Sequence, residues 1–224
     1  MRAKLSVVMP TLNAEAGLRR SLPALAEGLE AGLIRELVIS DGGSDDATVR
    51  VAEAAGARLV EGVASRGGQL RRGAGVAQGD WLLFLHADSV LSPGWAVIVK
   101  DHITAARGAA AFRLAFDARG VAPRLVAGWA NLRSRLFGLP YGDQGLLIPR
   151  TVYDATRGYR DIPLMEDVAM AQALGRRITL LGAVATTSAE RYRRDGWLRR
   201  GGRNLLLLLR YLAGARPEEL ARRY

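Results

Sequence analysis

The sequence predicts an α/β fold in which helices flank a mostly parallel central sheet. Two observations predict this class. Short apolar runs end at Gly, Pro or Asp, as buried strands of a parallel sheet do. Segments of helical composition, roughly ten to fifteen residues long, separate these runs, and such alternation is typical of βαβ units. The length of 224 residues and the hydrophobic content of 49% suit one domain with a full core.

Each predicted strand is an apolar run that stops at a turn residue or a charge. The central run is WLLFL at residues 81–85, and His86 and Asp88 follow it. If the chain stays extended, these two side chains point to one side, at the sheet edge where α/β proteins bind ligands. Residues 109–116 fit a strand or a helix, and we expect a strand. Further strands are expected at residues 5–9, 36–40, 57–60, 146–148 and 178–181.

The predicted helices lie between these strands and at the C-terminal end. Asn13 is expected to cap the first helix, and Asp46 or Ser44 the second. Pro23 lies inside the first helix and predicts a kink or two separate helices. The helices are expected at residues 15–31 and 47–55, in part of the Gly-rich stretch 66–78, after Pro93 as a first-turn proline, and at residues 121–137, 166–174, 197–212 and 217–223.

Charge and cysteine content limit the environment and the partners. The formal net charge is +10, and Cys is absent, which excludes disulfides and thiolate metal sites and suits a cytoplasmic protein. No window reaches the ~20 apolar residues of a membrane span. Six Arg cluster within residues 191–203 and suit a phosphate group, an anionic membrane surface or nucleic acid. They are Arg191, Arg193, Arg194, Arg199, Arg200 and Arg203.

We expect this cluster to form a flap or basic face at the mouth of an active site. Tyr192 and Trp197 lie within it and can stack on a ligand or pack in the core. If the partner of this cluster is an anionic membrane, we expect the segment to make peripheral contact with the inner membrane face. The alternative, a solvated helix surface, stays open at this stage.

The chain lacks the sequence motifs of two common classes of nucleotide-binding protein. A dinucleotide-binding enzyme needs G-x-G-x-x-G after the first strand, where this chain has PTLN, and a P-loop is also absent. A basic nucleic-acid-binding protein is the non-enzyme alternative. Acidic residues at three predicted strand ends would repel nucleic-acid phosphates, so we expect no nucleic-acid partner.

Four motifs occur in order between residues 7 and 177: VVMPTLN, ISDGGSDDAT, GDWLLFLHADS and LMEDVAMAQALGRR. Together they resemble glycosyltransferase family 2, whose members are inverting sugar transferases with the GT-A fold. The chain is most similar to a small bacterial subgroup with LHAD and GDQ motifs, of the arsenosugar-biosynthesis type. The resemblance covers nearly the whole chain. It implies a nucleotide-sugar donor, for which we expect a uridine diphosphate sugar, and an acceptor that the sequence does not identify.

The resemblance also implies donor-binding residues. Asp41 matches an acid that contacts the base or ribose of the donor, although Gly42 replaces the second Asp of the usual pattern. Arg71 stands where the family usually has Asn. Arg66 lies just before the central strand, where it can face the donor phosphates or solvent. The first loop contributes the remaining donor-binding candidates, Pro10, Thr11, Asn13 and Glu15.

A metal site is implied at the end of the central strand. Asp88 matches the last acid of the Asp-x-Asp motif that holds a metal-bound diphosphate, and His86 replaces the first Asp. The expected cofactor is Mn²⁺ or Mg²⁺. Because imidazole is a borderline ligand that hard Mg²⁺ favours less, the replacement affects the metal preference.

Catalysis and acceptor binding are assigned to the second half of the chain. Asp167 matches the general base of the Glu-Asp motif, and Glu166 is its catalytic neighbour. An attacking hydroxyl needs such a positioned carboxylate. Without the resemblance, the favoured interpretation of Asp167 is an acid that stabilises a helix start. Asp143 and Gln144 match the acceptor loop, although Gly-Asp sequences also form simple turns.

The chain is therefore predicted to be a single glycosyltransferase domain. Residues 1–90 form its nucleotide-sugar-binding half, residues 91–190 its acceptor and catalytic half, and residues 191–224 a basic helical segment. Asp88 and Asp167 argue against the alternative of a nucleotide-sugar-binding relative without transferase activity. Oligomeric state is not encoded in any pattern that we find.

Overall fold

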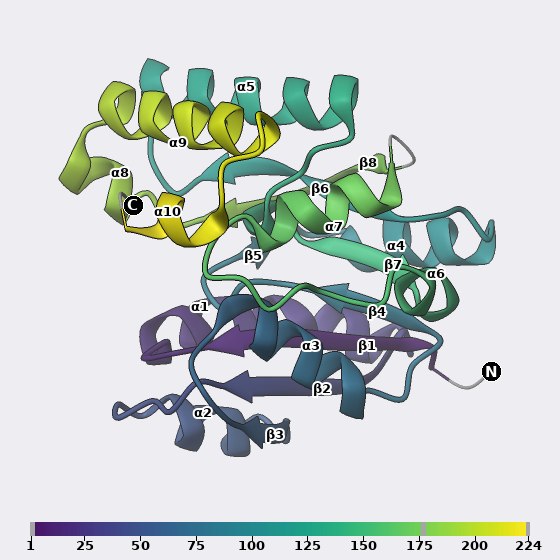
Figure 1. Cartoon of the computed structure of the whole chain (residues 1–224). Coiled ribbons are helices and arrows are strands. Elements are labelled where there is room, and N and C mark those ends of the chain that lie inside the picture. The colour runs from purple at the N-terminus through teal and green to yellow at the C-terminus, as the bar shows by residue number, and fades with distance from the viewer. Residues whose placement is uncertain (1–2, 176–177, 223–224) are drawn as a thin grey trace.

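One eight-stranded sheet runs through the molecule in the computed structural model, which describes residues 3–175 and 178–222 (Figure 1). The strand order is β3-β2-β1-β4-β7-β6-β8-β5. The pairs among β1 to β4 are parallel, and so is β6 with β8, whereas β7 and β5 run antiparallel to their neighbours. The strands are β1 (Leu5–Thr11), β2 (Ile34–Asp41), β3 (Arg58–Glu61), β4 (Trp81–Phe84), β5 (Val90–Leu91), β6 (Ala110–Phe116), β7 (Leu146–Pro149) and β8 (Thr179–Thr187).

Helices cover both faces of this sheet and extend beyond it at the top of the view in Figure 1. They are α1 (Glu15–Glu30), α2 (Thr48–Ala54), α3 (Arg66–Val76), α4 (Trp95–Thr104), α5 (Val121–Phe137), the short 3₁₀ helix η1 (Gly142–Gln144), α6 (Arg150–Ala155), α7 (Glu166–Leu174), α8 (Glu190–Asp195), α9 (Trp197–Leu212) and α10 (Pro217–Ala221). Within the described residues, no helix has the length and apolarity that crossing a bilayer requires.

The two faces of the sheet carry two separate cores. Val7 and Leu83 point to the face where Trp95 of α4 is fully buried. Val8 and Phe84, one position along each strand, point to the opposite face, towards α3, α6 and α7. Because side chains alternate along a strand, each apolar run serves both cores, which explains why β1 and β4 are almost continuously hydrophobic.

The predicted fold class is confirmed, and the segment at 109–116 is a strand, as expected. Several strand bounds differ from the prediction; β1, for example, ends at Thr11 and not at residue 9. The central strand ends at Phe84, one residue early. β8 extends to Thr187 instead of ending near residue 181, because it pairs with both β6 and β5. The predicted end of the last helix, residue 223, lies outside the described residues.

The predicted helix starts need several corrections. Asn13 does not cap α1, because the capping position is Ala14 and Asn13 has a left-handed backbone with φ of 48°. Instead, carboxylate and hydroxyl oxygens beside α2 accept hydrogen bonds from the Ala14 and Glu15 N–H groups, in one case Thr48 Oγ1 at 2.7 Å. Pro23 does not break α1, because it lies on the exposed face, where water can bond the carbonyl left without a partner.

The starts of α2, α3 and α4 also differ from the prediction. Asp46 Oδ1 accepts the Thr48 N–H at 2.8 Å, one position before the formal cap at Ala47, whereas Ser44 bonds elsewhere. The stretch expected to be part loop is helical from Arg66 to Val76. Pro93 stands outside α4, which begins at Trp95, because the Glu27 carboxylate accepts the N–H groups of Gly94 and Ala96.

Candidate active site

The candidate site lies at the carboxyl ends of the parallel strands, where the first turn of α7 and the short helix η1 meet the loop after β4. Asp167 lies in the first turn of α7, and its Oδ2 accepts a hydrogen bond of 2.9 Å from the Gly142 N–H. A Cβ placed on Gly142 would overlap His86 Nε2 and would lie 2.7 Å from Asp167 Oδ2. Glycine is therefore required here for close packing, and it lets His86 and Asp167 approach the same point.

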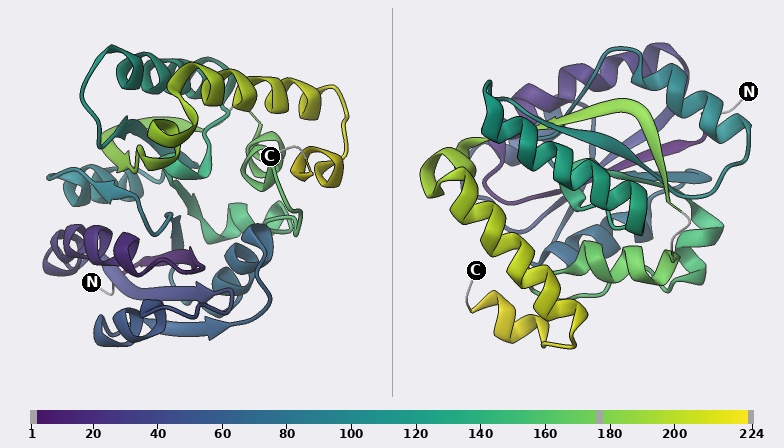
Figure 2. Two further views of the ribbon diagram at one scale, coloured as in Figure 1. Left: turned by 90° about the vertical axis from the view of Figure 1, so that its left-hand side faces the viewer. Right: turned by 90° about the horizontal axis from the view of Figure 1, so that it is seen from above.

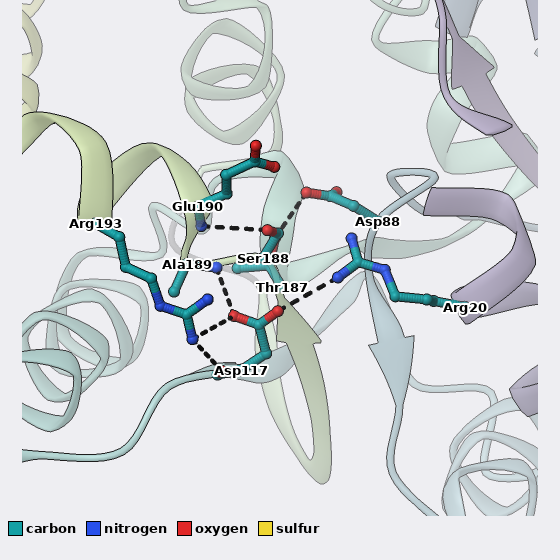
Figure 3. Close-up of polar contacts among 8 residues, drawn as sticks. All are labelled: Arg20, Asp88, Asp117, Thr187, Ser188, Ala189, Glu190 and Arg193. Atoms are coloured by element: carbon teal, nitrogen blue, oxygen red, sulfur yellow. Dashed lines mark hydrogen bonds and ion pairs between the residues drawn. The ribbon is translucent and has the colours of Figure 1, made fainter. Parts of the chain in front are cut away.

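The loop after β4 turns sharply. The Ser89 N–H donates to the His86 carbonyl at 3.0 Å, so the chain does not stay extended here, which was the condition for expecting His86 and Asp88 to point to one side. His86 lies against Gly142 and Asp167. Asp88 instead points towards the end of β8, where its Oδ2 accepts a hydrogen bond of 3.3 Å from Thr187 Oγ1 (Figure 3). The two side chains thus have different contacts, although the charge of Asp88 still acts on His86.

Four atoms around this centre are shielded from solvent and have no hydrogen-bond partner. They are His86 Nε2, Asp143 Oδ1, Glu166 Oε1 and Asp167 Oδ1. Buried polar atoms are nearly always satisfied in folded proteins, so a local concentration of unsatisfied ones marks a place where a ligand can supply the missing partners. Three of them are carboxylate oxygens and suit a hydroxyl group or a cation.

Burial changes the charge states of this cluster. Desolvation raises the pKa of Asp143 to about 6, with Asp167 and Asp88 adding repulsion and Arg133 opposing the shift. Desolvation, followed by repulsion from Asp167, raises the pKa of Glu166 to about 8. For His86, desolvation lowers the pKa and the nearby Arg66 lowers it further. Near neutral pH, Glu166 therefore holds a proton and His86 is neutral.

The two Arg candidates of α3 have different surroundings. Arg66 Nη1 lies 3.6 Å from Glu166 Oε1 and is among the charges that act on His86 and Asp143. Arg71 is on the exposed face of the helix, where its charge lowers the pKa of Tyr153, against the larger effect of burial. The structure brings Arg66 to the acidic cluster and gives no such contact for Arg71.

Asp41 organises the loops at the ends of β1 and β2. Its carboxylate is fully buried and accepts four hydrogen bonds: from Thr11 Oγ1, Ser44 Oγ, and the N–H groups of Gly43 and Ser44. Burial alone would raise the pKa of Asp41, but these bonds outweigh it, and the pKa is lowered. The carboxylate thus stays ionised, with its lone pairs directed into the loop.

The rest of the first loop extends away from the carboxylate cluster towards α2. Asn13 Oδ1 accepts the Asp45 N–H at 2.9 Å, and its own N–H donates to Ser44 Oγ. Glu15 pairs with Arg19 and lines a surface depression of about 510 Å³ between α1 and α2. Pro10, still within β1, pairs with Ser40 of β2 and is half-buried.

Gln144 is buried, and its amide holds the acceptor-loop candidate in place. Its Oε1 accepts from Ser134 Oγ at 2.7 Å, and its Nε2 donates to the Phe112 carbonyl at 3.1 Å. Asp143, the adjacent residue, faces the acidic cluster instead. Within the turn, therefore, Gln144 is the anchor, whereas Asp143 has a shielded carboxyl oxygen that lacks a hydrogen-bond partner.

Sequence reasoning missed three residues that shape the site. Arg133 of α5 is buried, and its guanidinium carbon lies 3.5 Å from the ring centroid of Tyr141. Thr187 bonds Asp88. Gln69 Nε2 donates to the carbonyls of Thr11 and Ser40, and so ties β1 to β2. Polar residues on otherwise buried helix faces, as Gln69 and Arg133 are, were the signal available in the sequence.

Several Arg side chains of the basic segment after β8 form ion pairs with acidic side chains. Arg193 contacts Asp117, which also accepts the Ala189 N–H at 2.7 Å and pairs with Arg20 of α1 (Figure 3). Arg194 and Arg200 both pair with Asp195. Tyr192 and Trp197 stack on each other, with ring centroids 4.8 Å apart. Arg191 is exposed, and its charge acts on His86, which places it near the site mouth.

The side chains of the candidate site include possible ligands for a divalent cation. Among residues 3–175 and 178–222, no group of three His, Asp or Glu side chains is arranged to hold a metal ion. Asp88 offers a partly exposed carboxylate at the strand end. Mg²⁺-type sites commonly use one or two carboxylates together with substrate phosphates and water, so the donors present fit a cation that arrives with a diphosphate.

Several solved structures share this fold. Staphylococcus aureus TarS, residues 1–349, aligns with a TM-score of 0.59 at 15% identity, over 82% of this chain and 57% of that one. Glucosyl-3-phosphoglycerate synthase from Mycobacterium tuberculosis, in complex with Mn²⁺, uridine diphosphate and glucosyl-3-phosphoglycerate, aligns with a TM-score of 0.59 at 22% identity, over 83% and 70%. At these identities the likeness establishes the fold, and the chain spans little more than half of the TarS chain.

Comparison by sequence identifies the family. No curated protein matched the chain. The family model described as glycosyl transferase family 2 matches residues 6–134, which include Asp41 and Asp88 and end before Asp143 and Asp167. Because this match covers more than half of the 224 residues, the chain belongs to glycosyl transferase family 2.

Proposed function

We propose that this glycosyltransferase moves a sugar, with inversion, from a nucleoside diphosphate donor to an acceptor hydroxyl, and that Asp167 is the general base. The observation that carries the proposal is the position of Asp167. Its Oδ2 is fixed by the Gly142 N–H at 2.9 Å, while its Oδ1 has no partner. An oriented carboxylate with one free oxygen beside other unsatisfied atoms is suited to take a proton from a bound hydroxyl.

The neighbouring acid fits a different role. Glu166 is 1% exposed, and its pKa is raised to about 8 by burial and by Asp167. A carboxylic acid that is already protonated at neutral pH cannot accept the acceptor's proton. Two adjacent carboxyl groups in unequal environments therefore divide the work, with Asp167 as base and Glu166 as a neutral support near Arg66.

The donor is assigned to the carboxyl ends of β1, β2 and β4. Asp88 would hold a divalent cation, Mn²⁺ or Mg²⁺, together with the diphosphate, and the cation would stabilise charge on the leaving group. Arg66 adds positive charge on the same side. The M. tuberculosis synthase of the same fold was solved with Mn²⁺ and uridine diphosphate, and TarS with uridine diphosphate N-acetylglucosamine, which supports a uridine diphosphate sugar as the donor.

We divide the domain into two halves according to which residues we assign to the donor and which to the acceptor. Residues 1–90 carry the donor loops with Thr11 and Asp41, and residues 91–190 carry Asp143 and Asp167. We assign acceptor contact to Asp143, which faces the cluster, while Gln144 holds its turn. Residues 191–224 form the basic helical segment.

A thermal-shift screen of nucleotides and nucleotide sugars, each with and without Mn²⁺, tests the function. Ligands that bind the folded state raise the unfolding midpoint by mass action. We expect a concentration-dependent increase with uridine diphosphate sugars that depends on Mn²⁺. Binding without transfer to any acceptor would favour a silent nucleotide-sugar-binding relative, and no shift with any nucleotide sugar would refute the proposal.

A further inference from the structure

Helices α5 and α9 lie side by side on the outside of the molecule, with α5 against β6 and β8 and α9 against α5 (Figures 1 and 2). A Cβ placed on Gly201 of α9 would lie 3.8 Å from Val126 Cγ2 of α5, which locates the seam between them. The inner side of each helix is buried, and it includes Ala130 on α5 and Leu208 on α9. The outer side of both helices remains uncovered within the described chain.

An exposed apolar stripe runs along each helix. The members on α5 recur every three or four residues, which places them on one helix face. They are Val121, Leu125, Trp129, Leu132 and Leu136. The members on α9 are Leu198, Leu205, Leu209 and Leu212, whose spacings of seven, four and three residues also place them on one helix face.

The two stripes form one surface. Val126 at the seam is three residues from Trp129, and Gly201 is three residues from Leu198 and four from Leu205, so each stripe borders the seam. We call this surface the α5–α9 face. Leu125 is 65% exposed and Leu198 is 85% exposed. Adjoining apolar side chains with this much exposure mark an interaction surface.

Arginines border the α5–α9 face, and no acid lies on either helix. Arg124 and Arg135 lie on the outer edge of α5, and Arg199 and Arg210 on the opposite edge of α9. Helices with Leu and Trp on one face, flanked by Arg, are suited to the boundary between headgroups and acyl chains. Trp129, which is 47% exposed, is the type of residue enriched at that boundary.

We propose that the α5–α9 face binds the surface of a bilayer that contains anionic phospholipids. Charge decides between this occupant and a second copy of the chain. A symmetric dimer through the face would bring these Arg edges together with no acid on α5 or α9 to compensate, whereas anionic headgroups neutralise them. Bilayer contact would then hold the enzyme beside a lipid-linked or membrane-proximal acceptor.

Sedimentation with vesicles tests the charge component. We expect the full chain to bind vesicles of phosphatidylcholine with 30 mol% phosphatidylglycerol, and to bind pure phosphatidylcholine much less. High salt should weaken the binding. The pair Arg199→Gln and Arg210→Gln should lower the partition coefficient roughly 25-fold, at about fivefold for each charge. Equal binding to neutral and anionic vesicles would overturn the proposal.

A second set of variants tests whether the α5–α9 face is the surface that contacts the bilayer. The pair Leu125→Ser and Leu209→Ser should weaken binding roughly tenfold or more, because two apolar side chains no longer enter the bilayer. The matched control is Leu29→Ser with Val97→Ser, two residues on α1 and α4 that are 60% and 61% exposed. If the control pair weakens binding as much as the α5–α9 pair, the face is misassigned.

Fluorescence gives a readout that does not depend on those variants. Trp81 and Trp95 are buried and Trp197 packs on Tyr192, so brominated lipids should quench mainly Trp129. The quenching should disappear in Trp129→Phe. Quenching that persists in this variant would overturn the assignment, as would a concentration-dependent dimer that the Leu125→Ser and Leu209→Ser pair abolishes.

Discussion

Asp167 and Gly142 are joined by a hydrogen bond of 2.9 Å from the Gly142 N–H to Asp167 Oδ2, and the same glycine leaves room for the His86 ring. This contact connects the first turn of α7 with η1, two segments far apart in the sequence. It fixes one oxygen of the proposed base and directs the other towards the unsatisfied atoms of the cluster. The predictions below follow from this centre and from the loops that support it.

Gly142→Ala should lower the transfer rate while leaving the affinity for the donor nearly unchanged. The added Cβ would lie 2.7 Å from Asp167 Oδ2 and overlap His86, so both side chains must move. Steady-state kinetics together with calorimetry of the nucleotide separate the two effects. Gly75→Ala on α3 is the control, because nothing lies within 4 Å of its added Cβ. Equal rates for the two variants would contradict the packing argument.

Asp167→Asn should lower transfer about 10²–10⁴-fold, because it keeps the shape of the side chain and removes its basicity. Donor binding should persist, since we assign the donor to the loops that Asp41 organises, to Asp88 and to a cation. Glu166→Gln should retain much of the activity at neutral pH, because Glu166 is already protonated there. If Glu166→Gln is inactive and Asp167→Asn is not, the base is misassigned by one residue.

Asp88→Ala should remove most of the Mn²⁺-dependent affinity for uridine diphosphate, by roughly 100-fold or more, because Asp88 is the proposed carboxylate ligand. Isothermal titration calorimetry with and without Mn²⁺ measures this loss. Asp80→Ala, an exposed acid just before β4, is the matched control. Metal-dependent binding that survives in Asp88→Ala would show that another residue holds the cation.

Glu166 should make the protein less stable as the pH rises. The pKa of Glu166 is raised from 4.5 to about 8 in the folded state, so the folded protein retains a proton that the unfolded chain releases between these values. Its stabilising contribution is therefore complete below about pH 4.5 and is lost as the pH approaches 8.

Urea unfolding of Glu166→Gln at pH 6.5 and pH 8 checks this expectation. The free energy of unfolding of the wild type should fall more steeply over this interval than that of the variant. The interval lies above the pKa of about 6 for Asp143, which limits the contribution of that group. Glu53→Gln on the exposed surface of α2 should keep the wild-type slope. Identical slopes for all three proteins would argue against a buried, protonated Glu166.

Gln69→Leu should destabilise the fold by roughly 2–3 kcal/mol, because two buried carbonyls, of Thr11 and Ser40, lose their donor. Chemical denaturation measures the change. Gln78→Leu is the control, since that side chain is exposed and bonds Arg35 at the surface, and we expect a change within about 0.5 kcal/mol. A similar cost for both variants would mean that the tie between β1 and β2 contributes little.

The sequence by itself determined the fold class and indicated which strand ends carry the candidate site. Short apolar runs such as WLLFL identified the strands, since a strand buried on both faces is continuously hydrophobic, and the motif order identified the family resemblance. Helix starts were predicted less well. Asn13 and Pro93 have the right local chemistry for helix starts, yet the first-turn N–H groups of α1 and α4 bond to side chains from other elements.

Only the tertiary structure decided how the site residues face one another. A backbone hydrogen bond turns the chain after β4, so His86 contacts Gly142 and Asp167 whereas Asp88 bonds Thr187. Burial, which depends on all the packed elements together, separates Glu166 from Asp167 although the two are adjacent in sequence. The approach of Gly142 to Asp167 joins residues 25 positions apart. Local patterns report what a residue can do, whereas desolvation and long-range contacts decide which of those roles it can take.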